Sequence, residues 1–378
     1  MQPTRVLACL LVLVGATVSY SSAQEANGAC RLTNGGGGEC RDLRSCPAVL
    51  RTMHRERPVI CSIRGRVAVV CCPTGGGPGP VQGISPPAVN FECGIQSKRT
   101  VSGGLLRFRR QLSASQRLPK TEPTAGGLVV GGHDAELSAW PWMALLGDRD
   151  AAGSIDWFCA GMLINEQWIL TAAHCFERRA NVIRLGEHDY SNPNDGANPE
   201  DLGVATTIAH PQYRKPQLYH DIGLIRLNKR VTIQPYIRPV CLPWGAESNV
   251  DLVGKTVTVT GWGLTQPGGR FSPLLQEVDV TVFPTAQCDQ DYKKHKSYNL
   301  LWPQGIGAGI MCAGDRDGGK DACKGDSGGP AVYSDGRGRF TLAGIISSGE
   351  GCGNQEFPGL YTNVRQSQYL AWIKQVAF

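Results

Sequence analysis

Three short segments of the chain carry side chains that could act together in nucleophilic catalysis. His174 ends a Thr-Ala-Ala-His run, Asp221 begins an Asp-Ile-Gly-Leu run, and Ser327 lies in Gly-Asp-Ser-Gly-Gly-Pro. A serine hydroxyl is a weak nucleophile at neutral pH and needs a base within hydrogen-bond reach. Histidine titrates near neutral pH, so His174 is suited to take that proton and pass it to a leaving group. Asp221 could hold the imidazole in the required tautomer.

The order His, Asp, Ser, with His174 next to Cys175, resembles the chymotrypsin family of serine proteases over residues 129–378. A lone serine in a glycine-rich turn, or a lone histidine, is usually structural. The three motifs together imply His174 as base, Asp221 as its partner and Ser327 as nucleophile. The backbone N–H groups of Gly325 and Ser327 are expected to bind the oxyanion, where one donor is worth about 3 kcal/mol.

The primary specificity pocket can be read from the same resemblance. Its floor is the residue six before the nucleophile, here Asp321, and a carboxylate there implies substrates with Arg or Lys. The alternative is a solvated loop carboxylate. Ser347, Gly349 and Gly359 match pocket positions, and the glycines leave room for a long side chain. Ala322 stands where digestive trypsins often have serine, so we expect Arg, with its bidentate guanidinium, to be preferred over Lys.

An activation switch is also predicted. The Val-Val-Gly-Gly segment that starts at Val129 resembles the N-terminus that zymogens of this family expose on cleavage. The released amine of Val129 is expected to pair with Asp326 and order the oxyanion loop. The residue before the cut is Leu128, which predicts an activating protease that accepts leucine. The alternative processing site is the basic run 107–110, which resembles a furin-type sequence.

The cysteines indicate a disulfide framework in an exported chain. Of the 15 cysteines, Cys9 lies in the leader, and the remaining number is even. Zinc sites usually show paired CxxC or histidine-rich spacing, which is absent. Six cysteines fall between Cys30 and Cys72, a segment too short to rely on a hydrophobic core, so three disulfides should hold it together. Spacing alone fixes no pairing.

The six-cysteine segment, with its adjacent pair Cys71 and Cys72, resembles the clip domain of arthropod serine proteases. The resemblance to clip and protease domains implies a pairing for every cysteine outside the leader. In it, a bridge from the linker to the protease keeps the light chain attached after activation. The implied pairs are Cys30 with Cys71, Cys40 with Cys61, Cys46 with Cys72, Cys93 with Cys241, Cys159 with Cys175, Cys288 with Cys312, and Cys323 with Cys352.

Composition divides the chain into four parts. Residues 1–23 have a basic start, an apolar run and small residues near the end, as in a signal peptide. Residues 24–72 form the expected clip domain. Residues 73–128, rich in Gly, Pro and Ser, are expected to be a linker. Residues 129–378 form the expected trypsin-like protease domain.

The elements that must position the site are mostly strands. Short β-like runs at 157–164, 255–262 and 341–348 alternate with turn-rich segments. Apolar residues at i, i+3, i+4 and i+7 from Tyr369 predict a terminal helix. The predicted class is all-β: a chymotrypsin-like double β-barrel with a C-terminal helix, plus a small disulfide-knotted N-terminal clip domain.

Charge and layout narrow the function. The formal net charge of +6 is concentrated in the linker and gives no support for nucleic-acid binding. No segment after the leader is apolar for about 20 residues, so no membrane span is expected. The layout resembles secreted haemolymph cascade proteases of melanisation, clotting or Toll signalling. Leu128 resembles the clip C subgroup, which implies three partners: another clip protease zymogen as substrate, an upstream activator and a serpin-type inhibitor.

Two other function classes were weighed. A catalytically dead clip adaptor would typically lack the nucleophile, but Ser327 is present, and a digestive protease would normally lack the knotted N-terminal domain. No cofactor is expected to be required for catalysis. Glu187 and Glu200 stand where trypsin-like proteases often place calcium ligands, so a structural calcium site is a hypothesis, the alternative being a solvated acidic loop.

Overall fold

The computed structural model divides the chain into two compact units, Met1–Val81 and Gln82–Phe378, each described here by itself. The predicted signal peptide, the basic run 107–110 and the bond between Leu128 and Val129 lie outside the described residues. Those described are 28–31, 37–42, 46, 49, 58–64, 67–73, 86–87, 91–96, 131–265, 269–319, 321–323, 325–336 and 338–378.

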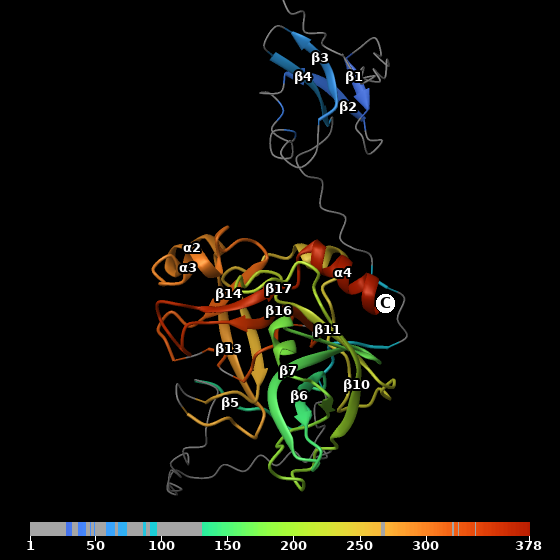
Figure 1. The fold of residues 1–378 in the computed structure, drawn as a ribbon, viewed down its shortest axis with the longest axis vertical. Helices are drawn as coiled ribbons and strands as arrows, with labels where there is room; N and C mark the ends of the chain where they lie inside the picture. Colours follow the sequence, from blue (N-terminus) through green and yellow to red (C-terminus); the bar gives the residue numbers. More distant parts are fainter. Residues whose placement is uncertain are drawn as a thin grey trace, which may run out of the picture. The chain divides into compact units, whose positions relative to one another are not determined.

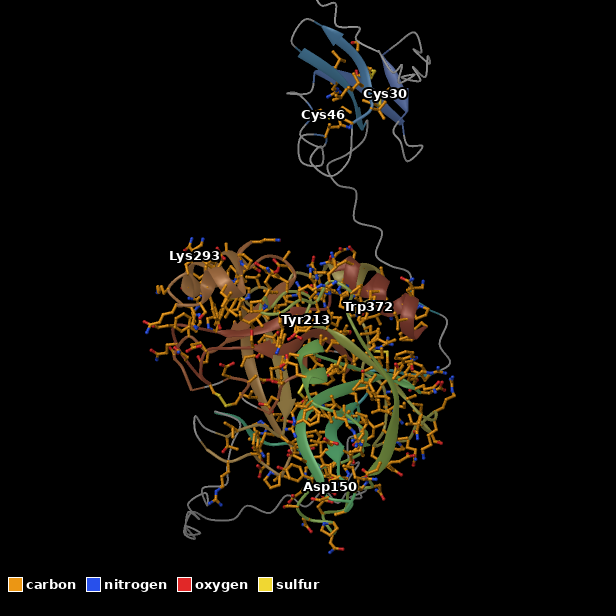
Figure 2. The ribbon with its side chains drawn as sticks, in the orientation of Figure 1. Cys30, Cys46, Asp150, Tyr213, Lys293 and Trp372 are labelled. Atoms are coloured by element: carbon orange, nitrogen blue, oxygen red, sulfur yellow. A yellow bond between two sulfur atoms is a disulfide. The ribbon has the colours of Figure 1, made fainter. Side chains whose placement is uncertain are left out.

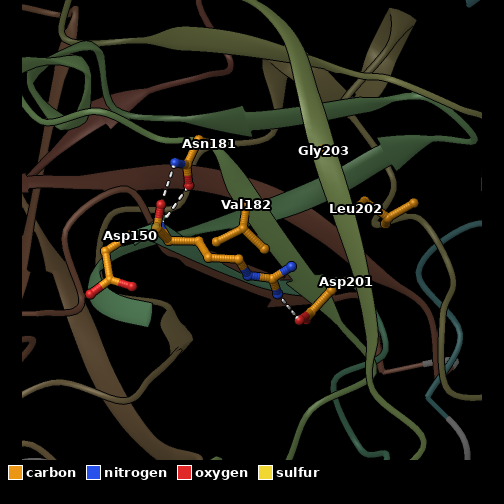
Figure 3. Close-up of a pocket in the computed structure, with 7 residues that line it drawn as sticks. Asp150, Asn181, Val182, Asp201, Leu202 and Gly203 are labelled. Carbon is orange, nitrogen blue, oxygen red and sulfur yellow. Dashed lines mark hydrogen bonds and ion pairs between the residues drawn. The ribbon is translucent and has the colours of Figure 1, made fainter. Parts of the chain in front are cut away.

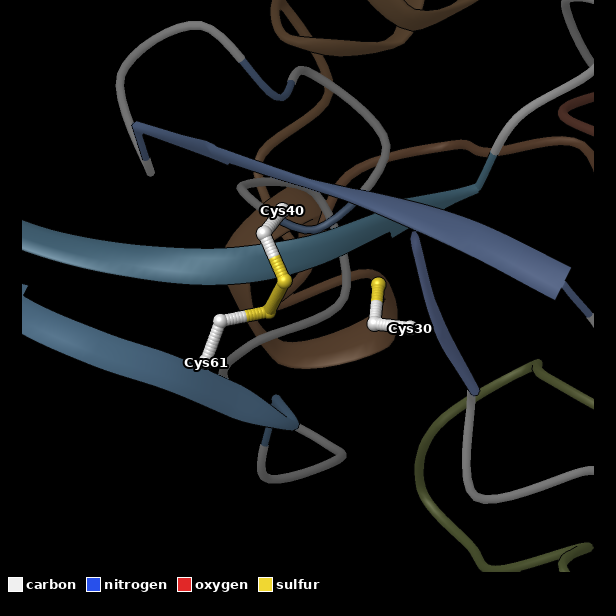
Figure 4. Close-up of side chains that lie close together, drawn as sticks. All are labelled: Cys30, Cys40 and Cys61. Carbon is white, nitrogen blue, oxygen red and sulfur yellow. A yellow bond between two sulfur atoms is a disulfide. The ribbon is translucent and has the colours of Figure 1, made fainter. Parts of the chain in front are cut away.

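The N-terminal unit contains one antiparallel sheet, in the strand order β1-β2-β4-β3. Its described buried cluster is small, and half of the residues in it are disulfide-bonded cysteines. The three disulfides therefore supply the stability that so small a hydrophobic core cannot. Figure 4 shows the Cys40–Cys61 bond with Cys30 beside it. These three sulfurs lie within 4.8 Å of one another, but each is in a disulfide and none is a free metal ligand. The strands are β1 (Ala29–Arg31), β2 (Gly37–Asp42), β3 (Ile60–Arg64) and β4 (Val67–Pro73).

The first barrel of the larger unit closes in the order β10-β11-β8-β7-β6-β9. Strand β7 contains the predicted run 157–164 and buries seven successive residues, which fits a strand covered on both faces. The short strands β8 and β11 are almost fully buried and carry the catalytic segments at their ends. The strands are β6 (Met143–Arg149), β7 (Ile155–Asn165), β8 (Trp168–Thr171), β9 (Val182–Leu185), β10 (Glu200–Ala209) and β11 (Gly223–Leu227).

The second barrel has the order β12-β15-β16-β17-β14-β13, with β5 at its edge, and it closes because β12 also pairs with β13. Along β13, Val278, Val280 and Val282 are buried while their neighbours face outward, the period of two expected of a strand. The strands are β5 (His133–Asp134), β12 (Thr256–Gly261), β13 (Gln276–Phe283), β14 (Ile310–Gly314), β15 (Pro330–Ser334), β16 (Phe340–Ser348) and β17 (Gly359–Asn363).

Few helices accompany the barrels. In Figure 1 the terminal helix α4 (Ser367–Ala377) packs beside them, and it buries Tyr369, Trp372 and Ile373 as the sequence periodicity predicts. None of the described helices is long and apolar enough to cross a membrane. The others are η2 (Ala173–Glu177), η3 (Gly245–Asn249), α2 (Thr285–Tyr292) and α3 (Tyr298–Leu301). The predicted fold class is confirmed.

The segment before the protease domain is anchored to the larger unit. Cys93 is bonded to Cys241, and the next residue, Gly94, donates to Pro239 O and accepts from Phe340 N, each over 2.8 Å. A Cβ at Gly94 would lie 2.1 Å from Phe340 O, so only glycine allows this approach. Within the larger unit the remaining bridges are Cys159–Cys175, Cys288–Cys312 and Cys323–Cys352, so all seven pairs are those implied by the resemblance.

Candidate active site

Two of the three candidate catalytic residues come from the first barrel, and the third comes from the second barrel. His174 lies on η2, directly after β8, and Asp221 lies two residues before β11. Strands β8 and β11 pair with each other in the first barrel, which brings these two segments together. Ser327 stands three residues before β15 of the second barrel. The site therefore forms where the two barrels meet.

Asp221 and His174 form a partly buried hydrogen-bonded pair. The Asp221 side chain is fully buried, and its Oδ2 lies 2.7 Å from His174 Nδ1. Its Oδ1 accepts from the His174 backbone N–H over 2.8 Å. Burial opposes protonation of His174, but the hydrogen bond and charge of Asp221 outweigh it and raise the His174 pKa. The arrangement fixes the tautomer that leaves Nε2 free to act as a base.

Two further side chains hold Asp221. Ser347 Oγ of β16 donates to Asp221 Oδ2 over 2.6 Å, and Thr362 Oγ1 of β17 donates to the Asp221 carbonyl over 2.6 Å. Ser347 is predicted to line the substrate pocket, and its hydroxyl binds Asp221. Thr362 was not singled out at all. Because both residues are more than a hundred positions from Asp221, only the closure of the second barrel reveals these contacts.

Ser327 lies beside the segment that carries His174. Its carbonyl accepts from Ala160 N over 2.8 Å and lies 3.7 Å from Cys175 Sγ. Within the described residues, Ser327 Oγ makes no hydrogen bond, to His174 Nε2 or to any other group. Catalytic hydrogen bonds are often long before substrate binds.

The loop around Gly325 has the backbone of an oxyanion site. Gly325 has a φ of +100°, a conformation that favours glycine. In the described part of the chain, the N–H groups of Gly325 and Ser327 have no hydrogen-bond acceptor, so both are available to a ligand. A Cβ at Gly325 would lie 2.5 Å from the ring of Phe271, which the sequence analysis missed. Phe271 is 48% exposed and forms an apolar wall of this loop.

Asp321 is a buried carboxylate with one free oxygen. Only 3% of the residue is exposed; Oδ2 accepts from Gly353 N over 3.2 Å, while Oδ1 has no partner among the described residues. Burial raises the Asp321 pKa to about 7, against the opposing effect of nearby N–H groups. The buried Tyr361 hydroxyl is likewise unpartnered. The unpaired Asp321 oxygen would be satisfied by a bound cation that offers several donors.

The pocket glycines differ in how much space they leave. A Cβ at Gly359 would lie 2.6 Å from Asp321 Oδ1, whereas a Cβ at Gly349 would meet nothing closer than 3.7 Å. Gly359 is therefore needed for the carboxylate itself, whereas a methyl group at position 349 would make only ordinary contacts. Ala322 lies next to the carboxylate and is half-buried.

Asp326 is completely buried without a side-chain cation in the described part of the chain. Its Oδ1 accepts from Gly263 N over 2.7 Å and its Oδ2 from Cys323 N over 2.9 Å. A Cβ at Gly263 would lie 2.6 Å from the carboxylate, so glycine allows the backbone to approach it. Burial raises the Asp326 pKa to about 6 despite these two donors. The arrangement would gain from a cationic partner.

The two residues of the calcium hypothesis each contact a basic side chain. Glu187 Oε2 accepts from Arg184 over 3.1 Å, and Glu200 is 2.8 Å from Lys229. Neither belongs to a cluster of three metal-ligating side chains within the described residues. Arg184 also binds both oxygens of Asp201, at 2.6 and 3.0 Å. Glu187 and Asp201 are thus held by one guanidinium, and calcium binding by Glu187 and Glu200 stays a prediction.

A second arginine reaches the same carboxylate. Arg149 lines a pocket of about 240 Å³ and forms an ion pair with Asp201. Asn181, which Figure 3 labels together with Asp201, binds the Arg149 backbone. Together Arg149 and Arg184 lower the Asp201 pKa, outweighing its burial. Two arginines thus hold Asp201 in the folded chain.

Comparisons with known proteins agree with this geometry. The sequence pattern described as trypsin matches residues 129–373. Serine protease snk of Drosophila melanogaster is 34% identical over 361 residues, covering 92% of this chain and 78% of that protein. The proclotting enzyme of Tachypleus tridentatus is 30% identical, with coverage of 89% and 87%. Phenoloxidase-activating enzyme 1 of Spodoptera litura is 31% identical and covers 97% of each chain.

Proposed function

Because the chain belongs to the trypsin family of serine proteases and is a serine endopeptidase of the arthropod clip-domain type, we propose that it is a secreted zymogen whose active form cleaves after Arg, and less well after Lys. Its substrate is the zymogen of another protease in a haemolymph immune cascade. The observation that carries the specificity is the free, buried oxygen of Asp321.

The proposed reaction follows from the Asp221–His174 pair. Ser327 Oγ attacks the carbonyl carbon of the scissile bond while His174 Nε2 takes the hydroxyl proton, and the N–H groups of Gly325 and Ser327 bind the resulting oxyanion. Collapse of this intermediate breaks the C–N bond, and the leaving amine takes the proton from His174. Water, deprotonated by His174, then hydrolyses the acyl-enzyme and restores Ser327. Asp221 stays ionised and stabilises the imidazolium.

Recognition of the substrate is assigned to Asp321. A guanidinium can bind its free oxygen and offer further donors to the Tyr361 hydroxyl and to water, which suits a fork of five N–H groups. The ammonium of Lys is a compact charge on a shorter side chain and would need help from a hydroxyl at position 322. Ala322 supplies no hydroxyl. Binding of either cation favours the charged carboxylate and so lowers the Asp321 pKa from about 7.

Activation is assigned to cleavage between Leu128 and Val129. The new amine of Val129 would pair with Asp326, whose complete burial and raised pKa mean that a cation stabilises its charged form. Arginine specificity would then prevent the enzyme from cutting after Leu128 in its own precursor. An upstream protease that accepts leucine is therefore required, as in the clip C subgroup. Cleavage at the basic run 107–110 would not create the amine at Val129.

The place in a cascade is supported by the relatives, two of which are named for clotting and for phenoloxidase activation. The Cys93–Cys241 bridge supports a light chain that stays attached after activation. A serpin-type inhibitor is the proposed regulator of the active enzyme. No metal enters the proposed reaction, and calcium bound by Glu187 and Glu200 would have a structural role.

The function is tested with activated protein and peptide amides that end in Arg, Lys, Phe or Leu. Residues 124–128 are replaced by an enteropeptidase recognition sequence so that the cut falls before Val129. We expect cleavage after Arg first and Lys second, and total loss in Ser327→Ala, which should still fold and be secreted. Asp321→Ser should lose most activity toward Arg. Activity in Ser327→Ala, or better cleavage after Phe or Leu, would overturn the assignment.

A further inference from the structure

Directly before Asp221 the backbone adopts an unusual conformation. His220 has a φ of +56°, and among the described non-glycine residues only Ser138 shares a positive φ. The left-handed region is unfavourable for residues with a Cβ, and it persists only where the surroundings enforce it. The proposed reaction uses no part of the His220 side chain. The strained conformation of His220, next to the Asp221 carboxylate, therefore needs another explanation.

The His220 ring is held by two other side chains. It stacks on the ring of His210, with centroids 5.1 Å apart and planes 14° from parallel. Its Nδ1 lies 3.1 Å from the hydroxyl of Tyr369 on α4. The three residues, called here the imidazole stack, join the end of β10, the segment before β11 and the terminal helix.

The stack rests on a rigid base. His210 is 5% exposed and Tyr369 is 1% exposed. Trp372, which projects from the same helix in Figure 2, packs edge-on against His210 at 5.1 Å. The backbone is fixed as well, because His210 N donates to Ile222 O over 3.0 Å and Ile222 N donates to His220 O over 2.8 Å. Both neighbours of Asp221 are thus held.

The protonation states fit a hydrogen-bonded, uncharged stack. Burial and the neighbouring imidazole of His220 lower the His210 pKa to about 4, and burial lowers the His220 pKa. Burial raises the Tyr369 pKa to about 12, so its hydroxyl stays protonated at neutral pH and shares a hydrogen bond with His220 Nδ1. At neutral pH no charge repulsion opposes the stacking of the two rings.

We propose that the imidazole stack is a positioning device for catalysis: it holds residue 220 in the left-handed conformation and thereby aims the Asp221 carboxylate at His174. His220 and Tyr369 act through Asp221 and are positioning residues. The inference rests on the proposed catalytic role of Asp221. It predicts that loosening the stack impairs the chemical step more than substrate binding, because the Asp321 pocket is built from other strands.

The test compares activated variants prepared with the enteropeptidase sequence. His220→Val places a β-branched residue in the left-handed region, while His220→Asn is the conservative variant because asparagine enters that region readily. Tyr369→Phe removes only the hydroxyl and keeps the ring in the core. Ser138→Val is the matched control, since it imposes the same backbone strain far from Asp221 in sequence and outside the proposed catalytic machinery.

We expect kcat for an Arg amide to fall at least about tenfold in His220→Val, about threefold in Tyr369→Phe and little in His220→Asn, with KM nearly constant. The charged groups that act on His174 are Asp221, Glu177 and Lys215, and Asp221 raises its pKa most. A displaced Asp221 therefore lowers the His174 pKa, so the acidic limb of kcat/KM should move to lower pH in His220→Val and Tyr369→Phe. A purely structural role would lower thermal stability without moving that limb, as expected for Ser138→Val.

The outcomes separate this inference from the proposed function. If Ser327→Ala and His174→Ala abolish activity but His220→Val and Tyr369→Phe keep the wild-type kcat and acidic limb, the positioning role is wrong and the catalytic assignment stands. Should His220→Val fail to fold, an unchanged kcat and limb in Tyr369→Phe alone would refute the role. If Ser327→Ala or His174→Ala remains active, the proposed function fails first.

Discussion

A methyl group at position 359 should alter the choice between Arg and Lys without touching the catalytic residues. In Gly359→Ala the new Cβ would lie 2.6 Å from Asp321 Oδ1, closer than such atoms approach in proteins, and 3.3 Å from Ala313 O. The alanine sits on β17 and cannot retreat from the sheet, so the carboxylate must move by about 0.5 Å. The oxygen that moves is the one left free for the substrate cation.

The magnitude follows from the geometry of the two cations. A bidentate guanidinium tolerates displacement of its partner poorly, and a misplacement of about 1 Å can cost about 100-fold in rate. We therefore expect kcat/KM for Arg substrates to fall about 10- to 100-fold, equal to about 1.4–2.8 kcal/mol of transition-state stabilisation. A Lys ammonium is a mobile point charge and should lose about threefold to tenfold. The Arg to Lys ratio should thus decrease.

The assay is steady-state hydrolysis of matched Arg and Lys peptide amides, with active enzyme counted by titration of Ser327. Gly349→Ala is the matched control, since its Cβ would meet nothing closer than 3.7 Å and leaves Asp321 in place. It should narrow the entrance and reduce both substrates without lowering the Arg to Lys ratio. An unchanged ratio in Gly359→Ala, or an equal change in both variants, would refute this account of the pocket.

Four further outcomes are expected. Leu128→Arg should make the zymogen activatable by trypsin, measured by amidolysis and by sequencing of a heavy chain that starts at residue 129, whereas full activation of the unaltered zymogen by trypsin would contradict the switch. The activated protein should run as one band without reductant and as two with it because of the Cys93–Cys241 bridge; two bands without reductant would exclude the tether. The free-enzyme pKa of Asp321 is raised to about 7, and only the carboxylate binds a cation. Benzamidine inhibition should therefore weaken below pH 7, with the inhibition constant rising about tenfold per pH unit. An inhibition constant that stays the same from pH 5 to 8 would contradict this prediction. Because Glu187 and Asp201 are already held by Arg184, EDTA should leave the melting temperature unchanged, and a clear drop that calcium restores would support a metal there.

The parts of the site that lie within one short segment could be predicted from the sequence. His174, Asp221 and Ser327 each stand in a recognisable run, and Asp321 lies at a fixed distance from Ser327, so their identities need no tertiary information. The terminal helix was predictable because its apolar spacing matches the helical period over two turns. The double barrel itself came from resemblance, since short strands alone fit a sandwich equally well.

The parts that depend on distant segments could not be predicted. Ser347 Oγ reaches Asp221 only after β16 closes the second barrel, and the contact of Tyr369 with His220 joins residues 149 positions apart. The sequence likewise gives no sign that the Arg184 side chain, three residues earlier, turns toward Glu187. A sequence shows which charges exist; the fold decides which of them neutralise one another.

The anchored segment around Cys93 has a consequence for where proteolysis takes place. A bridge from Cys93 to Cys241, reinforced by two backbone hydrogen bonds at Gly94, keeps the N-terminal unit covalently joined to the enzyme when the bond before Val129 is cut. Whatever surface or molecule captures that unit would retain the newly active protease. Cleavage of the next zymogen would then be confined to the neighbourhood of the initiating event, because the local concentration of enzyme there exceeds that in the surrounding fluid.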